Sequence, residues 1–234
     1  MKTKLIPIIA LTASLCLPAA VSSAEKAIPG QQSMVILEGN FQFIPGSWAD
    51  YTILDKAKNE TYRMLMSVLE QENYKGLPCR WLEIEVAMKD QPTVVTRILA
   101  TETKNGPGDL QKAVVQVEGY SPFSVPNKFL QGKDQEVAKV ESAQVVKRLE
   151  RKTLSHLGKT IQAWVVEAQT AQGKNVSAVV SEELPPFCIY QAETEDTRMT
   201  VNDWGLGATT RIKGEPTSFF LWIIEQIGRE LNKK

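Results

Sequence analysis

The stretch GLPCRWLEIEVAMKDQPTVVTRIL, residues 76–99, decides the fold of this chain. In its first half, one apolar side chain occurs at every second position: Leu82, Ile84, Val86 and Met88. The positions between them hold Trp81, Glu83, Glu85 and Ala87. This period of two predicts a strand with one buried face. Residues 89–92 supply a turn, and residues 94–99, rich in β-branched side chains, return as a second strand. The stretch therefore predicts a β-hairpin, with Glu83 and Glu85 on its solvated face.

Most of the remaining chain shows the same alternation of short strands and turns. Single strands are expected at residues 47–54, 62–69, 94–99, 110–117, 187–194, 199–204 and 208–212. Residues 136–157 are expected to be mainly strand, and residues 158–184 a second hairpin. The fold class that we predict is mainly β (α+β). It is a curved antiparallel sheet or half-barrel of roughly eight to eleven strands, with one C-terminal helix packed on it.

That helix is predicted over Thr217–Leu231. Pro216 and the following hydroxyl residues suit a helix start. Large apolar side chains follow the i, i+4, i+7, i+11 row at Phe220, Ile224, Ile227 and Leu231. Three more apolar side chains widen this stripe: Phe219, Trp222 and Ile223. We expect this stripe to dock on the concave face of the sheet. The alternative is an amphipathic helix on a membrane surface, which the small number of cations disfavours.

The first 24 residues have the features of a cleaved signal peptide. A short basic start precedes the apolar residues 5–17, and the small residues 21–24 offer a cleavage site. Leu15 before Cys16 disfavours lipidation, which needs a small residue there. We expect export to the periplasm, residues 25–234 as a single domain, and no transmembrane segment after cleavage.

The net charge limits which classes of partner the protein can attract, and the cysteines bear on the redox state of its compartment. Lys and Arg number 27 and Asp and Glu number 27, so no net field attracts nucleic acid. Beyond the signal segment the chain has two cysteines, Cys79 and Cys188. In an exported protein we expect these two to form a disulfide, the alternative being two buried free thiols.

The sequence does not point to a catalytic or metal site. His156 is the single histidine, and nothing near it supplies further metal ligands. Residues 205–208 (GLGA) lack the third glycine and the helix of a dinucleotide site. We therefore assign no catalytic residue, no metal and no cofactor, and predict a protein that is not an enzyme. A hydrolase remains open through a serine or cysteine hydrogen-bonded to His156.

Aromatic residues are the best candidates for a ligand site. Five tryptophans are spread over the chain, and residues 118–134 form a long loop with several large apolar groups. On a curved sheet such side chains would line a cavity for a lipid or another apolar molecule. The candidate set is Trp81, Trp164, Trp204, Phe123, Phe129 and Phe220. The alternative is an ordinary core, since large aromatics are usually buried.

Two C-terminal stretches carry a family resemblance: residues 179–190 (VVSEELPPFCIY) and residues 199–209 (MTVNDWGLGAT). Together they resemble the C-terminal half of bacterial exported proteins that look related to the half-barrel periplasmic lipoprotein carriers. The resemblance implies a long antiparallel sheet curled around a helix, with an apolar concave face that binds lipid or lipid-modified partners. It implies a glycine where this chain has Cys188, and it assigns no functional residue.

Three functions follow as hypotheses. The first is a periplasmic protein that binds or carries an apolar ligand, such as a lipid or a lipidated partner. The second is a structural or assembly factor that binds a partner protein at the cell envelope. The third is a hydrolase with a site that the sequence does not reveal.

Overall fold

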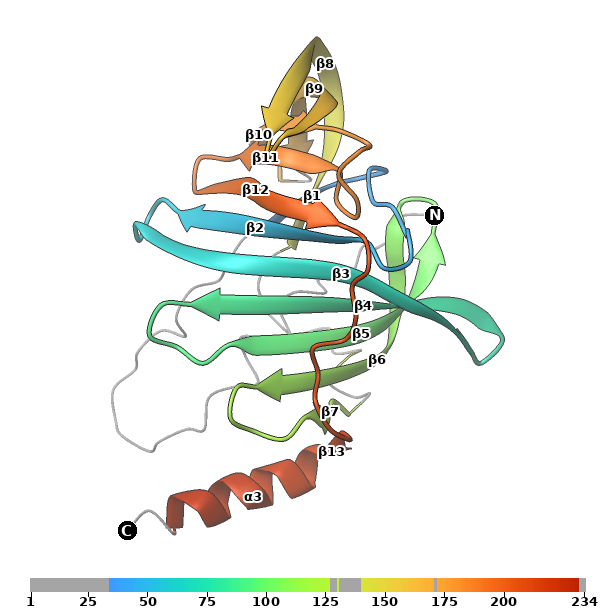
Figure 1. The fold of residues 1–234 in the computed structure, drawn as a ribbon, viewed down its shortest axis with the longest axis vertical. Coiled ribbons are helices and arrows are strands. Elements are labelled where there is room, and N and C mark those ends of the chain that lie inside the picture. Colours follow the sequence, from blue (N-terminus) through green and yellow to red (C-terminus); the bar gives the residue numbers. More distant parts are fainter. Residues whose placement is uncertain (1–33, 127–129, 131–139, 171, 232–234) are drawn as a thin grey trace.

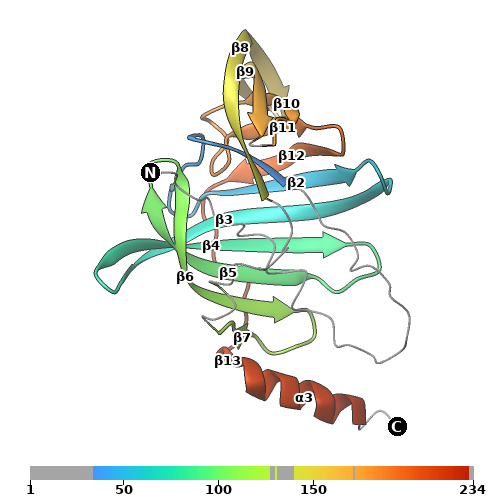
Figure 2. The same cartoon turned by 180° about the vertical axis from the view of Figure 1, so that it is seen from behind.

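The computed structural model describes residues 34–126, 130, 140–170 and 172–231. Its strands form one sheet in the order β1-β8-β9-β10-β11-β12-β2-β3-β4-β5-β6-β7-β13 (Figures 1 and 2). Within the described residues β1 and β13 end this order, so the sheet is open. The predicted fold class, a curved, mainly antiparallel sheet with one C-terminal helix packed on it, is confirmed. The predicted signal peptide lies outside the described residues.

One part of the sheet is an antiparallel meander. Its strands are β2 (Trp48–Asp55), β3 (Glu60–Tyr74), β4 (Leu77–Met88), β5 (Val94–Thr103) and β6 (Gly106–Val117). The hairpin predicted from residues 76–99 is β4 with β5, in which Trp81 pairs with Leu99. The turn before it has positive φ at Lys75 (53°) and Gly76 (78°), as a tight two-residue hairpin turn requires.

A second meander continues the sheet. It comprises β8 (Val140–His156), β9 (Lys159–Thr170), β10 (Asn175–Val180), β11 (Ile189–Glu193) and β12 (Thr197–Gly205). Strand β12 then pairs antiparallel with β2, and Val201 lies opposite Tyr51. This pairing makes one sheet from two hairpin series that are far apart along the chain.

Short strands extend both ends of the sheet. β1 (Met34–Leu37) pairs with β8 in parallel, and β7 (Phe123–Ser124) pairs with β13 (Thr217–Ser218) in parallel. These three strands bring the sheet to 13 strands, above the predicted eight to eleven. Strands of two to four residues have too little periodicity to be recognised in a sequence.

The two faces of the sheet are covered unequally. One face carries the main core, which includes Tyr51, Met64, Leu82, Ile84 and Ile98. The opposite face carries a small cluster of four buried residues: Leu69, Cys79, Trp81 and Leu99. The alternation in β4 therefore separates two different apolar environments, one on each side of the sheet.

Residues 206–216, which we call the strap, cross the face of the sheet that carries the small cluster. Figure 1 shows the strap running from the end of β12 across β3 to β6 towards β13. The strand predicted at residues 208–212 is wrong, because these residues form no ladder. The strap is bonded to the sheet mainly through side chains, such as Gln116, which pairs with the backbone of Lys213 at 2.8 and 3.2 Å.

Helix α3 (Phe219–Leu231) packs at the β7–β13 end of the sheet. The predicted docking is confirmed, but only part of the predicted apolar stripe is buried, and the side chains of Ile227 and Leu231 lie outside the part that the structure describes. Phe220 and Ile224 of the predicted row are 62% and 63% exposed, whereas Trp222 is 7% exposed and joins the core. The helix contacts the edge of the sheet, where β7 presents Phe123, rather than filling the concave face.

The predicted disulfide is a second correction, because Cys79 and Cys188 are both free and buried. Cys79 belongs to the small cluster, whereas Cys188 lies between Phe187 and Ile189, which both belong to the main core on the other face. Cys188 has a φ of 58°, the left-handed region that favours glycine.

Candidate functional site

The predicted ligand residue Trp81 is fixed within the small cluster. Its indole N–H donates to Glu72 Oε2 at 2.9 Å, and the guanidinium of Arg97 lies 4.5 Å from its ring centroid. Both polar contacts hold the ring against the sheet on the strap side. Trp81 therefore cannot share a cavity with side chains of the main core, which lies on the other face.

Trp204 belongs to the main core, beside His156. The ring centroids of these two side chains are 5.6 Å apart, and Lys159 Nζ lies 4.5 Å from the Trp204 ring centroid. Lys159 also donates to the Trp204 carbonyl oxygen at 2.9 Å. The β8–β9 turn is thereby bonded to the end of β12, although β10 and β11 separate these strands in the sheet.

The other predicted ligand residues lie in several different places. Phe123 is fully buried against Trp222 of α3, with ring centroids 4.5 Å apart, and Phe220 lies on the outer side of the same helix. Trp164 is 37% exposed on β9, and Phe129 lies outside the described residues. The described residues of the set are thus not gathered into one site, and their role as a ligand site stays a prediction.

Glu83, predicted to be solvated, is 2% exposed and anchors the strap. Its carboxylate accepts hydrogen bonds from the Thr210 hydroxyl at 2.6 Å and the Arg211 N–H at 2.8 Å. Burial raises the pKa of this carboxyl, while the two hydrogen bonds oppose the shift. The strap therefore covers a carboxylate that the alternation in β4 places on the outer face, and it satisfies both oxygens.

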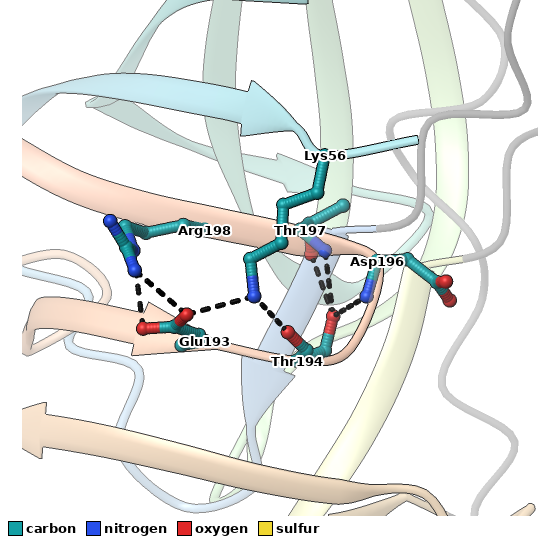
Figure 3. A network of polar contacts seen from close by, with 6 residues as sticks. All are labelled: Lys56, Glu193, Thr194, Asp196, Thr197 and Arg198. Carbon is teal, nitrogen blue, oxygen red and sulfur yellow. Dashed lines mark hydrogen bonds and ion pairs between the residues drawn. The ribbon is translucent and has the colours of Figure 1, made fainter. Parts of the chain in front are cut away.

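Figure 3 shows a polar network that joins the β11–β12 turn to the end of β2. Glu193 accepts two hydrogen bonds from Arg198, at 2.9 and 3.1 Å, and pairs with Lys56 Nζ at 2.8 Å. Lys56 also donates to the Thr194 carbonyl oxygen at 2.6 Å. These contacts, those with Arg198 above all, lower the pKa of Glu193 to about 2. Both oxygens of this carboxylate are paired with cations of the same chain, so the network has a structural role and links the two meanders.

Both ring nitrogens of His156 have hydrogen-bond partners in the fold. Its Nε2 lies 2.7 Å from the Asn202 carbonyl oxygen, and its Nδ1 lies 3.4 Å from the Tyr190 hydroxyl. Both ring nitrogens thus have partners that are neither serine nor cysteine. Across the described ranges, no cluster of three or more His, Cys, Asp or Glu side chains is arranged to hold a metal ion.

The outer face of α3 exposes three large apolar side chains. Phe220, Leu221 and Ile224 are 62%, 56% and 63% exposed, respectively. Phe219, Trp222 and Ile223 pack on the other side of the helix, against the core. The sequence showed a broad apolar stripe here, but it did not show which part of the stripe the sheet would cover.

The β8–β9 hairpin is the second exposed surface, at the opposite end of the molecule from α3 (Figures 1 and 2). Every residue of β8 from Gln144 to Thr153 is exposed. Val146 and Leu149 are 67% and 45% exposed, and four cations lie among them: Lys147, Arg148, Arg151 and Lys152. The guanidinium of Arg148 lies 5.7 Å from the ring centroid of Trp164, so this tryptophan belongs to the hairpin surface rather than to a cavity.

Sequence reasoning missed this surface. The run VVKRLERK at residues 145–152 combines β-branched and apolar side chains with four cations and one anion. That combination was the available signal, because a half-buried strand would show a clean alternation of apolar and polar residues instead.

Comparisons with known proteins add little to this geometry. No family model and no curated protein matches the chain. Among solved structures it is similar to a "putative lipoprotein" from Parabacteroides distasonis, at 9% identity, over 72% of this chain and 99% of that chain, with a TM-score of 0.33. A likeness this low carries no argument, so the resemblance to lipoprotein carriers stays a prediction. In the described part of the chain, no helix has the length and apolar character needed to cross a bilayer.

Proposed function

We propose that this protein is exported to the bacterial periplasm and binds a partner protein on its surface, without a catalytic step and without a cofactor. The observation that carries the proposal is the β8–β9 hairpin. It combines exposed apolar side chains, Val146 and Leu149, with four exposed cations on a strand whose outer edge is paired, among the described residues, only at 140–143. Exposed apolar groups among polar ones are typical of surfaces that bind other proteins.

The packing of the core supports partner binding over transport of an apolar ligand. Phe187, from the loop between β10 and β11, packs against Phe41 and Tyr51, with ring centroids 5.7 and 5.9 Å apart. Phe187 and Leu184 are 2% and 0% exposed. The chain thus covers apolar surface of its own sheet with its own side chains, and the predicted ligand residues Trp81 and Trp204 lie on opposite faces.

Site-specific photo-crosslinking in intact cells tests the proposal. A photo-crosslinking amino acid placed at Leu149 is expected to give an adduct of discrete mass, and mass spectrometry then identifies the partner and the crosslinked peptide. The matched control is the same amino acid at Ile44, which is 40% exposed and lies in the loop before β2. Equal adducts at both positions, or no adduct at Leu149, would refute partner binding by the hairpin.

Cell fractionation and native mass spectrometry test the other parts of the proposal. The protein is expected in the periplasmic fraction, with residues 1–24 removed. A lipid that co-purifies at one molecule per chain would instead favour the carrier hypothesis.

A further inference from the structure

We propose that the free edge of β8 takes an extended acidic segment of the partner protein as an additional strand. This inference rests on the proposed function and names the chemistry of the partner. It is carried by the pairing of β8, by the exposure of its side chains and by their charge.

Among the residues that the structure describes, the backbone of β8 is paired on one side only over most of its length. β9 pairs with it from Ala143 to His156. On the other edge β1 covers residues 140–143, and no other strand in the described ranges pairs with that edge. An unpaired edge presents alternating N–H and C=O groups, which is the template that an added strand recognises.

The regular part of this edge is Arg151–His156. Over these six residues the pairing with β9 runs without a break, from Arg151 opposite Trp164 to His156 opposite Lys159. Two irregularities lie earlier in the strand, one between Val145 and Lys147 and one between Arg148 and Arg151. An added strand therefore has its continuous register at residues 151–156, with Leu149 and Val146 as apolar contacts beside it.

Charge selects the occupant of this edge. Lys147, Arg148, Arg151 and Lys152 are all exposed, and the one acidic residue among them, Glu150, pairs with Lys152 at 2.7 Å. A second copy of the chain would bring four more cations to the same edge, and the repulsion between neighbouring like charges disfavours strand pairing. Cations and bulges are features that protect sheet edges against self-association. An acidic strand is the partner that these cations attract rather than repel.

Binding of a synthetic strand tests the inference directly. The probe is a fluorescein-labelled eight-residue peptide of alternating Glu and Val, and the control peptide has Lys in place of Glu. Fluorescence anisotropy is expected to show salt-dependent binding of the acidic peptide and none of the basic one. Hydrogen exchange of the full chain is expected to slow at the amides of residues 151–156 when the acidic peptide is bound.

Charge-reversal variants locate the site. Arg151→Glu with Lys152→Glu is expected to weaken binding of the acidic peptide by about tenfold or more, because two attractive pairs become repulsive. Lys89→Glu with Lys104→Glu is the matched control, since it makes the same charge change at two exposed residues outside the hairpin. That control should change affinity by less than about twofold, since distant exposed charges are screened by salt. Thermal unfolding of both variants checks that the fold is kept.

The outcomes separate this inference from the proposed function. No binding of the acidic peptide, or binding without slower exchange at residues 151–156, overturns strand addition. If the adduct at Leu149 still forms in that case, the partner binds the hairpin in another way and the proposed function stands. If the adduct is also absent, both proposals fail.

Discussion

Replacing Trp222 by alanine tests how α3 is held on the sheet. Trp222 is 7% exposed, and its ring centroid lies 4.5 Å from that of Phe123 and 6.4 Å from that of Tyr120. Phe220, two residues earlier on the same helix, is 62% exposed. The two aromatic residues therefore separate the docked side of the helix from its outer side within one turn.

The loss of stability expected for Trp222→Ala follows from the burial of the ring and from its indole N–H, which is unpaired among the described residues. Truncating a buried tryptophan to alanine costs about 3–5 kcal/mol. The indole N–H of Trp222 is buried and has no hydrogen-bond partner among the described residues. An unsatisfied buried donor costs about 1–3 kcal/mol, so part of the gain from burying the ring is already lost. We expect Trp222→Ala to lower the free energy of unfolding by about 3 kcal/mol.

Two further variants sharpen this test. Trp222→Phe keeps an aromatic ring and removes the unsatisfied N–H, so it is expected to change stability by less than about 1 kcal/mol. Phe220→Ala is the matched control, with an expected change within about 0.5 kcal/mol.

Equilibrium urea unfolding followed by far-ultraviolet circular dichroism measures all three variants. This signal does not depend on the tryptophan that is removed. A cost for Phe220→Ala equal to that of Trp222→Ala would show that the outer row of the helix is the docked one and would refute the reasoning. An unchanged midpoint for Trp222→Ala would refute it as well.

Two other predictions concern ionisable groups. Hydrogen bonds from Arg198, with a further contribution from Lys56, lower the pKa of Glu193 from 4.5 to about 2. The stability that these contacts provide is therefore present above the ordinary pKa of the carboxyl and is lost as pH falls towards 2. Glu193→Gln should remove this part of the acid dependence of the urea midpoint between pH 2 and 7, worth about 1 kcal/mol or less because the carboxylate is partly exposed. Burial raises the pKa of the Cys79 thiol and raises that of Cys188 to about 12, so neither should react with a thiol reagent at pH 8 in the native protein. Both should react once the chain from residue 25 onward is denatured without reductant, and the absence of free thiols there would restore the disulfide.

The sequence by itself determined the strands that carry a clear period of two. In the hairpin of residues 76–99, Leu82, Ile84 and Val86 face the main core as the alternation predicts. The turns were also recognisable, because Gly and residues that adopt positive φ cluster between the apolar runs. The existence of the C-terminal helix followed from its apolar stripe and its helix-start residues.

Tertiary structure decided which surfaces these elements bury. Alternation shows that Glu83 and Leu82 face opposite sides, but it does not show that the strap crosses the outer side and buries Glu83. The apolar stripe of α3 is wider than one contact surface, so the sequence left open whether Trp222 or Phe220 would dock.

Pairing between distant strands was likewise beyond the reach of the sequence. The β2–β12 ladder joins Tyr51 to Val201, and β1 ends opposite Ala143, beyond which no other strand of the described ranges pairs with that edge of β8. Local periodicity reports which side of a strand is apolar, because that pattern depends on residues two positions apart. For β2 with β12 and β1 with β8, pairing depends on contacts between residues more than a hundred positions apart, and only the folded chain brings these together.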